Sequence, residues 1–421
     1  MTDVTGVTWR APGPFGRLWA ASSVSNLGDG LYQFALPLLA LDLTRSPSLV
    51  AGVTLMLTVA WPVFGLHAGS IVDRFDRRRI LLIVSLLRLG TLGLLTAAIL
   101  GGALSLPMLY LAALVLGIGE TLADTALTAL VPSTVEPERL DWANGRIAAG
   151  QSVMNTFVGP PLAGALLSIG AALVTTVATT AYGLAAVALA TLSGTRRPDV
   201  TTRTPRPGWG VTDGLRFLWG HRTIRRLTLF TAAMNVWWAT WVALFVLFAV
   251  APGPIGLTPS AYAVLLVAMS IGGIGGSLWA GWISRAIGTK NALLLDLVGT
   301  GLLVGVPVLT TDPWIVAMAN VAAGTGAAIW VVLVASIRQR LTPDALLGRL
   351  YSASRLISWG VLPAGAALGG IAAEVLGIRT VFAVGAVTSA VLVVAFVVII
   401  TNDELELVVP PARDATRQLR Q

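Results

Sequence analysis

The chain has 421 residues, of which 55% are hydrophobic and only 11% are charged, and its mean hydropathy is +0.81. Average soluble chains carry roughly 25% charged residues, so these charges are too few to cover a surface that faces water. The composition therefore predicts an integral membrane protein. The net charge of +8 is spread over short loops without a dense patch, which excludes nucleic acid as a partner.

Twelve apolar runs follow one another along the chain, each about 20 residues or longer, the length that crosses roughly 30 Å of hydrocarbon. We expect helices, because each segment must satisfy its own backbone hydrogen bonds in lipid. The first run is too long for a secretory signal peptide, so we interpret it as a retained span. The predicted spans are residues 16–41, 48–71, 80–101, 106–131, 143–169, 172–194, 224–250, 259–284, 290–310, 314–337, 351–376 and 379–400.

Basic residues alternate along the chain with the predicted spans. The joins after odd-numbered spans are mostly uncharged, whereas those after even-numbered spans carry arginines. With the N-terminus in the cytoplasm, all but four of the 28 basic residues lie on the cytoplasmic side or in the cytoplasmic tail. Arg45 and Arg379 fall outside, and Arg88 and Arg355 fall within spans. The positive-inside rule therefore predicts that both termini are cytoplasmic.

A hydrophilic stretch, residues 195–223, divides the chain into two halves. We expect an N-terminal six-helix bundle (1–194), this cytoplasmic linker, a C-terminal six-helix bundle (224–401) and a cytoplasmic tail (402–421). From Val211 the linker predicts either an amphipathic helix on the inner leaflet or a linker whose side chains snorkel.

The two halves also repeat each other in sequence. Residues 144–167 align with 347–370, and residues 69–78 correspond in place to 281–290. Internal repeats of this kind are typical of secondary transporters. The expected fold is thus an all-α membrane protein of twelve transmembrane helices in two pseudo-symmetric six-helix bundles, acting as a monomer.

Three carboxylates lie within the predicted spans at positions that favour function. Ionisable groups there cost roughly 2.5–3.5 kcal/mol on insertion scales, so each is a functional hypothesis. Asp29 is near the middle of its span and Glu120 near the middle of another, with Asp124 one turn away on the same face. We expect them to bind protons or a cationic group of a substrate. Alternatively, Asp29 satisfies backbone groups beside its flanking glycines, and Asp124 pairs with Arg146.

Other charged residues within or near spans favour structural roles. Asp296 lies near the inner end of its span, where we expect an arginine partner, and Glu374 is expected to pair with Arg379. Arg355 is open to two interpretations: it meets a carboxylate in a cavity, or it snorkels to the interface.

Polar and aromatic residues of several spans predict the lining of a substrate site. A mostly apolar, aromatic cavity suits a hydrophobic or amphipathic organic solute, and its ring faces also suit cations. The alternative is that the tryptophans form belts at the membrane interface. The candidates for substrate binding are Tyr32, Gln151, Asn155, Asn235, Trp237, Trp241, Trp330, Arg355 and Trp359.

The sequence offers little for an enzyme, a metal site or an ATPase. It has no cysteine, and its two histidines, His67 and His221, lie far apart. Nucleophilic and thiolate chemistry therefore lack most of their side chains, and we expect no metal and no cofactor. Lys290, the only lysine, follows a threonine rather than the glycine of a phosphate-binding loop. Transport would draw on an ion or substrate gradient.

The join after the second span resembles the signature of the major facilitator superfamily. It reads Gly69-Ser-Ile-Val-Asp-Arg-Phe-Asp-Arg-Arg-Arg79, with a decayed copy at 281–290. The stretch Asn26–Gly30, the pair Glu120 and Asp124, and "LVPSTVEPERLDWANGR" leading to "VGPPLAG" resemble the drug-exporter branch that includes bacterial macrolide and siderophore exporters. The resemblance covers nearly the whole chain. Two positions depart from it: Ala113 replaces a frequent arginine and Ser85 replaces a frequent acidic residue.

This resemblance implies a gate at the inner ends of the spans. It implies that Asp73 latches spans two and eleven when the cavity faces outward. A carboxylate at a helix C-terminus needs a partner, which Arg74 or Arg88 could supply. The expected gating residues are Asp73, Arg74, Arg77, Arg78 and Arg88; the alternative is a solvated charge run that only fixes topology.

These observations lead to one preferred function. We expect a secondary active transporter of a bacterial cytoplasmic membrane, not an enzyme, that exports a hydrophobic or amphipathic small molecule in exchange for protons by alternating access. Its partners would be this substrate, protons and membrane lipids. The alternatives are an importer or lipid flippase of the same fold, or a non-transporting membrane receptor.

Overall fold

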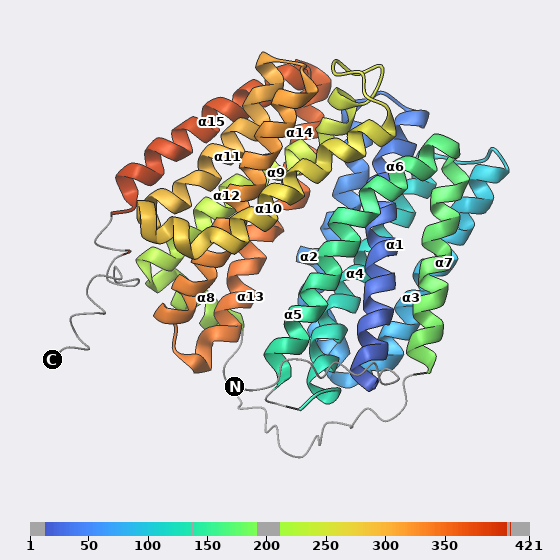
Figure 1. Cartoon of the computed structure of the whole chain (residues 1–421), viewed down its shortest axis with the longest axis horizontal. Helices are drawn as coiled ribbons and strands as arrows, with labels where there is room; N and C mark the ends of the chain where they lie inside the picture. The colour runs from blue at the N-terminus through green and yellow to red at the C-terminus, as the bar shows by residue number, and fades with distance from the viewer. Residues whose placement is uncertain (1–12, 137–138, 192–210, 402–404, 406–421) are drawn as a thin grey trace, which may run out of the picture. The chain divides into compact units, whose positions relative to one another are not determined.

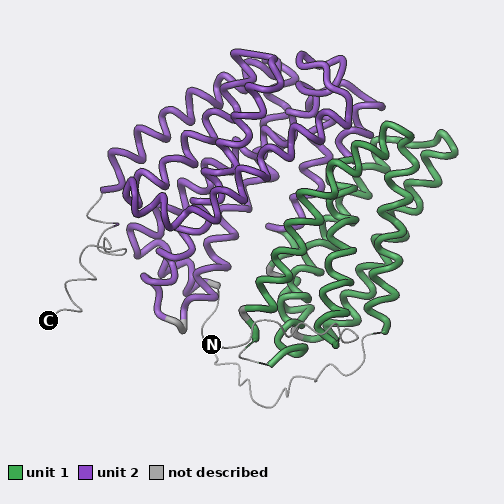
Figure 2. The backbone as a smooth tube through the Cα atoms, viewed as in Figure 1, with its two compact units in different colours: residues 1–35, 63–204 green, residues 36–62, 205–421 purple. Residues whose placement is uncertain are grey.

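The computed structural model describes residues 13–136, 139–191, 211–401 and 405, and every long element among them is a helix (Figure 1). The chain forms two compact units (Figure 2). The first comprises Met1–Ala35 and Val63–Thr204, and the second comprises Leu36–Pro62 and Pro205–Gln421. The C-terminal end of the first helix, from Leu36, and the second helix as far as Pro62 thus belong to the unit formed mainly by the C-terminal half of the chain.

The helices follow in chain order. The N-terminal half contains α1 (Pro14–Leu43), α2 (Pro47–Arg74), α3 (Arg77–Leu100), α4 (Leu106–Leu130), η1 (Val131–Ser133), α5 (Leu140–Gln151), the π-helical η3 (Ser152–Val158), α6 (Gly159–Ile169) and α7 (Ala171–Ala190). The C-terminal half contains α8 (Val211–Gly220), α9 (Arg222–Ala249), α10 (Pro259–Ile287), α11 (Thr289–Leu309), α12 (Pro313–Leu341), α13 (Asp344–Gly360), α14 (Leu362–Leu376) and α15 (Ile378–Ile399).

Eleven helical segments of the described chain are long and apolar enough to cross a membrane. Ten of them are expected spans between α2 and α14, three of which consist of consecutive helices, and the last is α15. The helix α1 is not among the eleven, although it runs unbroken for 30 residues. Its polar residues, which include Asn26 and Asp29, interrupt the apolar run.

Prolines explain why the fifth predicted span is built of three segments. Pro160 and Pro161 have no N–H groups, so two carbonyls in the preceding turn lose their usual partners. The backbone shifts into η3, and the Gly159 N–H donates to the Met154 carbonyl. A Cβ atom on Gly30 of α1 would lie 2.6 Å from the Asn155 carbonyl oxygen, so α1 and η3 meet backbone to backbone.

The eleventh predicted span is divided in the same way. Its helix begins earlier than expected, at Asp344, and breaks between α13 and α14 just before Pro363. The break frees carbonyl groups, and the Asn235 side chain of α9 donates to the Ser358 carbonyl at 2.6 Å. Asn235 therefore satisfies a helix end that the proline leaves open.

Glycines at spacing four bring the helices of the second unit together. Gly272 and Gly276 of α10 lie against the α12 backbone at Val321 and Thr325. The Thr325 hydroxyl donates to the Gly272 carbonyl at 3.1 Å. Such small residues allow the close helix contacts on which membrane proteins depend, since lipid provides no hydrophobic drive between helices.

The helix α8 confirms the prediction of a helix from Val211. Its Leu218 is fully buried and packs with Leu350 and Ala353 of α13, and Gly214 lies against the backbone at Arg349. The apolar side of α8 is therefore covered by protein in this structure.

Candidate functional site

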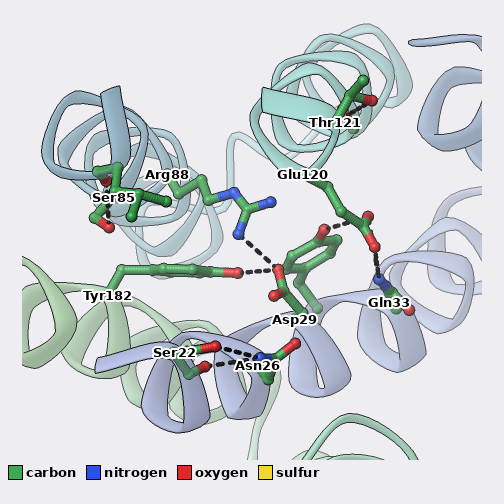
Figure 3. Close-up of polar contacts among 12 residues, drawn as sticks. Ser22, Asn26, Asp29, Gln33, Ser85, Arg88, Glu120, Thr121 and Tyr182 are labelled. Carbon is green, nitrogen blue, oxygen red and sulfur yellow. Dashed lines mark hydrogen bonds and ion pairs between the residues drawn. The ribbon is translucent and has the colours of Figure 1, made fainter. Parts of the chain in front are cut away.

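A buried ion pair lies at the centre of the first unit (Figure 3). An Arg88 nitrogen of α3 donates to the Asp29 carboxylate of α1 at 2.8 Å, and the two side chains are 1% and 8% exposed. The Tyr182 hydroxyl of α7 donates to the same carboxylate oxygen at 2.6 Å. Three helices thus meet at Asp29, whose charge is compensated by the arginine. Arg88, expected to serve the gate beside Asp73, is deeply buried and bonds Asp29.

Glu120 has a different set of partners. The hydroxyl of Tyr32 donates to its carboxylate at 3.3 Å, and the amide of Gln33 donates to both carboxylate oxygens at 3.2 and 3.3 Å (Figure 3). Both donors are neutral and both lie on α1. Glu120 forms no ion pair with the described side chains, so it has no cationic partner at bonding distance there.

Arg88 has hydrogen-bond donors without described partners beside Glu120. Its Nε and one of its Nη atoms are buried and have no hydrogen-bond partner within the described residues. A Cβ atom on Gly119 would lie 2.9 Å from Arg88 Nε, so this glycine lets the guanidinium lie against α4 directly beside Glu120. A buried arginine with idle donors can exchange partners without leaving its place.

A small polar cavity leads to this ion pair. It measures about 40 Å³, enough for about three water molecules. Asp29, Arg88 and Asp124 line it together with polar residues of α1 and apolar residues of α1, α3, α4 and α7. The remaining lining residues are Leu18, Ala21, Ser22, Ser25, Asn26, Leu81, Val84, Ser85, Ala123, Leu127 and Leu189.

The arginines of the signature-like join bond to helix ends. Arg77 donates to the Ala129 carbonyl of α4 at 3.1 Å, and Arg78 donates to the Leu189 and Ala190 carbonyls of α7 at 2.9 and 2.5 Å. Cations are favourable at helix C-termini, where carbonyls lack partners. These two arginines therefore tie α3 to its neighbours.

The other residues expected at the gate are described less fully. Arg74 is exposed in the last turn of α2. The side chain of Asp73 lies outside the described residues. A latch between spans two and eleven therefore stays a prediction.

The expected substrate residues of the second unit fall into two groups. Trp330 and Trp241 are each 3% exposed: Trp330 donates to the Thr231 hydroxyl at 3.0 Å, and Trp241 stacks on Phe245 with ring centroids 4.4 Å apart. Trp237 packs against Gly385 of α15. These side chains, and Asn235, contact neighbouring helices.

Arg355 and Trp359 form the second group. The Arg355 guanidinium lies 4.0 Å from the Trp61 ring centroid and 4.8 Å from that of Trp359. Arg355 contacts two rings and has no carboxylate within ion-pair distance among the described side chains, so its meeting with a cavity carboxylate is not observed there, and snorkelling to the interface stays a prediction.

Five other residues can be compared with their expected roles. Tyr32 is buried and bonds Glu120, whereas Gln151 and Asn155 are half-buried at the junction of α5 and η3. The prediction that Asp296 pairs with an arginine is wrong for the described part of the chain. The Glu374 carboxylate accepts hydrogen bonds from Ser46 and Ser48 rather than from Arg379.

Three residues of these sites were not predicted: Gln33, Tyr182 and Trp61. Gln33 lies one helical turn beyond Asp29, so helical spacing alone could have identified it. Tyr182 is the aromatic residue of a helix whose other polar residues are threonines, which is a weaker signal. Nothing in the sequence around Trp61 points to Arg355.

Comparisons with known proteins identify the family to which the chain belongs. Residues 11–412 match the family model of the transmembrane secretion effectors. The chain is 31% identical over 228 residues to the multidrug efflux pump Tap of Mycobacterium tuberculosis, a match that spans about half of each protein, 51% of this chain and 53% of Tap.

Two further proteins match over more of their length. The enterobactin exporter EntS of Citrobacter koseri is 28% identical over 347 residues, covering 80% of this chain and 79% of EntS. The fold is similar to that of a bacterial homologue of the iron transporter ferroportin in its inward-facing state, with a TM-score of 0.71, 15% identity, and coverage of 91% of this chain and 98% of that one. The chain therefore belongs to the transmembrane secretion effectors of the major facilitator superfamily, a family of multi-pass membrane proteins.

Proposed function

We propose that this membrane protein is a transporter rather than an enzyme, that it exports hydrophobic or amphipathic small molecules in exchange for protons, and that Glu120 carries the proton. In this proposal α1 is a twelfth span, the two halves (1–194 and 224–401) are six-helix bundles, and both termini are cytoplasmic. The relatives named as a multidrug efflux pump and an enterobactin exporter support efflux.

The observation that carries the proposal is the unequal pairing of two buried carboxylates. Asp29 faces a guanidinium, whereas Glu120 receives only neutral donors from Tyr32 and Gln33. An ionised carboxylate without a cation is costly at membrane depth, and protonation removes that cost. Glu120 is therefore the better site for a proton that is taken up and released in each cycle.

The idle donors of Arg88 suggest how release is coupled. When Glu120 loses its proton, its new charge attracts the buried guanidinium that lies against Gly119. A shift of Arg88 toward Glu120 weakens the bond to Asp29, which joins α3 to α1. Protonation would then change the contacts between helices, as alternating access requires. The cavity beside Asp29 offers water for the proton's path.

Substitution of Glu120 by Gln tests this role directly. The amide cannot carry a proton, but it can still bond Tyr32 and Gln33, so the fold should persist. We expect uptake driven by a pH gradient to fall to the level of empty vesicles. The measurement uses proteoliposomes and a panel of amphipathic dyes that carry positive, negative or no charge, with the thermal unfolding midpoint recorded for each variant.

The matched control is Glu136→Gln, the same chemical change at an exposed glutamate in the loop after η1. It should transport as the wild type does. Full pH-driven transport by Glu120→Gln would remove Glu120 from the mechanism. If the dyes move only when the pH gradient has the direction opposite to the one that drives exchange for protons, the result would favour the importer over the exporter.

A further inference from the structure

We propose that Trp61, Arg355 and Trp359 form a binding site for the anionic group of an amphipathic substrate. This site, here called the arginine cage, names a substrate class for the transport function proposed above and rests on that function. All three residues belong to the second unit. Trp61 comes from α2, and the other two come from consecutive turns of α13.

The geometry of the arginine cage is a guanidinium in the corner formed by two tilted rings. Arg355 lies 4.0 Å from the Trp61 centroid and 4.8 Å from the Trp359 centroid, and the ring planes are tilted by 60° with centroids 5.9 Å apart. Contacts with two rings hold the long side chain in one place. The two rings contact the guanidinium from directions roughly at a right angle, and its Nε, which has no partner among the described residues, stays available to a planar acceptor.

The position of Arg355 makes its pairing unusual. It lies inside the candidate span Leu346–Leu376 and at the fifth position of the predicted span 351–376, so it is an ionisable group within a membrane-spanning segment. A charged residue in such a segment normally pairs with an opposite charge or marks a substrate path. Its Nε atom is buried and has no hydrogen-bond partner in the described part of the chain.

The carboxylates of neighbouring spans do not supply the missing charge. Glu374 of α14 accepts from Ser46 and Ser48, and Asp296 lies in α11 without an ion pair among the described side chains. The arginine cage thus keeps an uncompensated positive charge within a membrane-spanning segment. An anion that arrives with a ligand would compensate it.

The same geometry disfavours a cationic ligand. The faces of both tryptophans are already in contact with a guanidinium, so they are not free for a second cation, which Arg355 would also repel. Trp359 is 42% exposed, and the exposed ring of Tyr351 lies two turns away on the same face of α13. These rings suit the apolar or aromatic body of an organic acid.

Equilibrium binding to the full chain in lipid nanodiscs tests the proposal. The probes are 2-naphthoate, the neutral 2-naphthamide and the cationic 2-naphthylmethylammonium, which share one ring system. We expect the wild type to bind the naphthoate at least about tenfold more tightly than either analogue, the effect of a charge-assisted hydrogen bond. Arg355→Gln should lose this preference and keep its affinity for the amide.

Two further variants separate binding from a structural role. Arg355→Lys keeps the charge without the planar edge, so it should fold and bind the naphthoate with intermediate affinity. Arg216→Gln removes an arginine whose side chain is 84% exposed and should bind as the wild type does. A pure clasp between α2 and α13 would lower the unfolding midpoint of both Arg355 variants and leave the preference for the anion intact.

Two results would overturn the inference. One is an equal affinity of wild type and Arg355→Gln for the naphthoate, and the other is the absence of naphthoate binding by the wild type. Because binding is measured without a gradient, it is independent of proton coupling. A preference for the anion together with a failure of pH-driven transport would refute the coupling scheme and leave the arginine cage standing.

Discussion

The loss of Asp29 and the loss of Arg88 should destabilise the protein unequally, although the two residues form one buried ion pair. Their side chains are 8% and 1% exposed, so removing either partner leaves the other charge in a low-dielectric interior. The consequences differ because an aspartate can take up a proton and become neutral, whereas an arginine stays charged in proteins. Asp29 is therefore harder to replace than Arg88.

This asymmetry predicts the stabilities of three variants. When Glu120 is protonated and cannot compensate Arg88, Asp29→Asn should cost about 3–5 kcal/mol, the usual penalty for an uncompensated buried charge, while Arg88→Gln should cost less. The double variant should be more stable than Asp29→Asn alone, because it removes the orphaned charge. Thermal unfolding midpoints in detergent micelles would show this order. A lower midpoint for Arg88→Gln than for Asp29→Asn would contradict the argument.

At the scale of helices, close backbone contacts at glycine residues determine how α1 and α6 pack. Gly30 of α1 and Gly159 of α6 approach so closely that a Cβ atom on Gly159 would lie 2.7 Å from the Gly30 Cα atom. The prolines after Gly159 produce the π-helical segment that meets α1 here. This contact positions α1, which carries Asp29 and the two donors to Glu120.

Adding a methyl group at this contact should therefore disturb the proton site. We expect Gly30→Ala to lower both the unfolding midpoint and pH-driven transport, because backbone atoms cannot move aside as a flexible side chain can. Gly65→Ala is the matched control: a Cβ there meets nothing within 4 Å, and alanine is the better helix former by about 1 kcal/mol. Its midpoint should stay equal or rise. Equal behaviour of the two variants would show that the contact is loose.

The elements were more predictable from sequence than the contacts between them. Apolar length identified the spans, since a helix in lipid needs only that. Pairing was not predictable in the same way: Arg88 and Asp29 are 59 positions apart, and nothing local distinguishes a partner for Asp29 from one for Asp73. Likewise, Trp330 reads as an inward-facing ring, but its spacing does not say whether it faces a substrate or, as here, a core of α9, α12 and α15.

Topology is the property of the whole molecule on which the transport proposal depends. An even number of spans, with α1 included, would put both termini on the same side of the membrane, and the distribution of arginines predicts that this side is the cytoplasm. If α1 does not cross, Asp29 and Glu120 lose their shared membrane depth. The hydropathy of α1 alone leaves it outside the eleven candidate spans, because its centre is polar.

The absence of cysteine from the chain makes the crossing of α1 directly measurable. We expect a membrane-impermeant maleimide to label Arg45→Cys in intact cells, whereas Gly13→Cys, at the other end of α1, should react only after the membrane is opened. Both positions are exposed. Ala103→Cys, between α3 and α4, and Phe75→Cys, between α2 and α3, provide outside and inside standards. Labelling of Gly13→Cys and Arg45→Cys from the same side would mean that α1 does not span the membrane. The proposed proton site, which α1 and Glu120 form together, would then lack the twelve-span topology on which transport across the membrane depends.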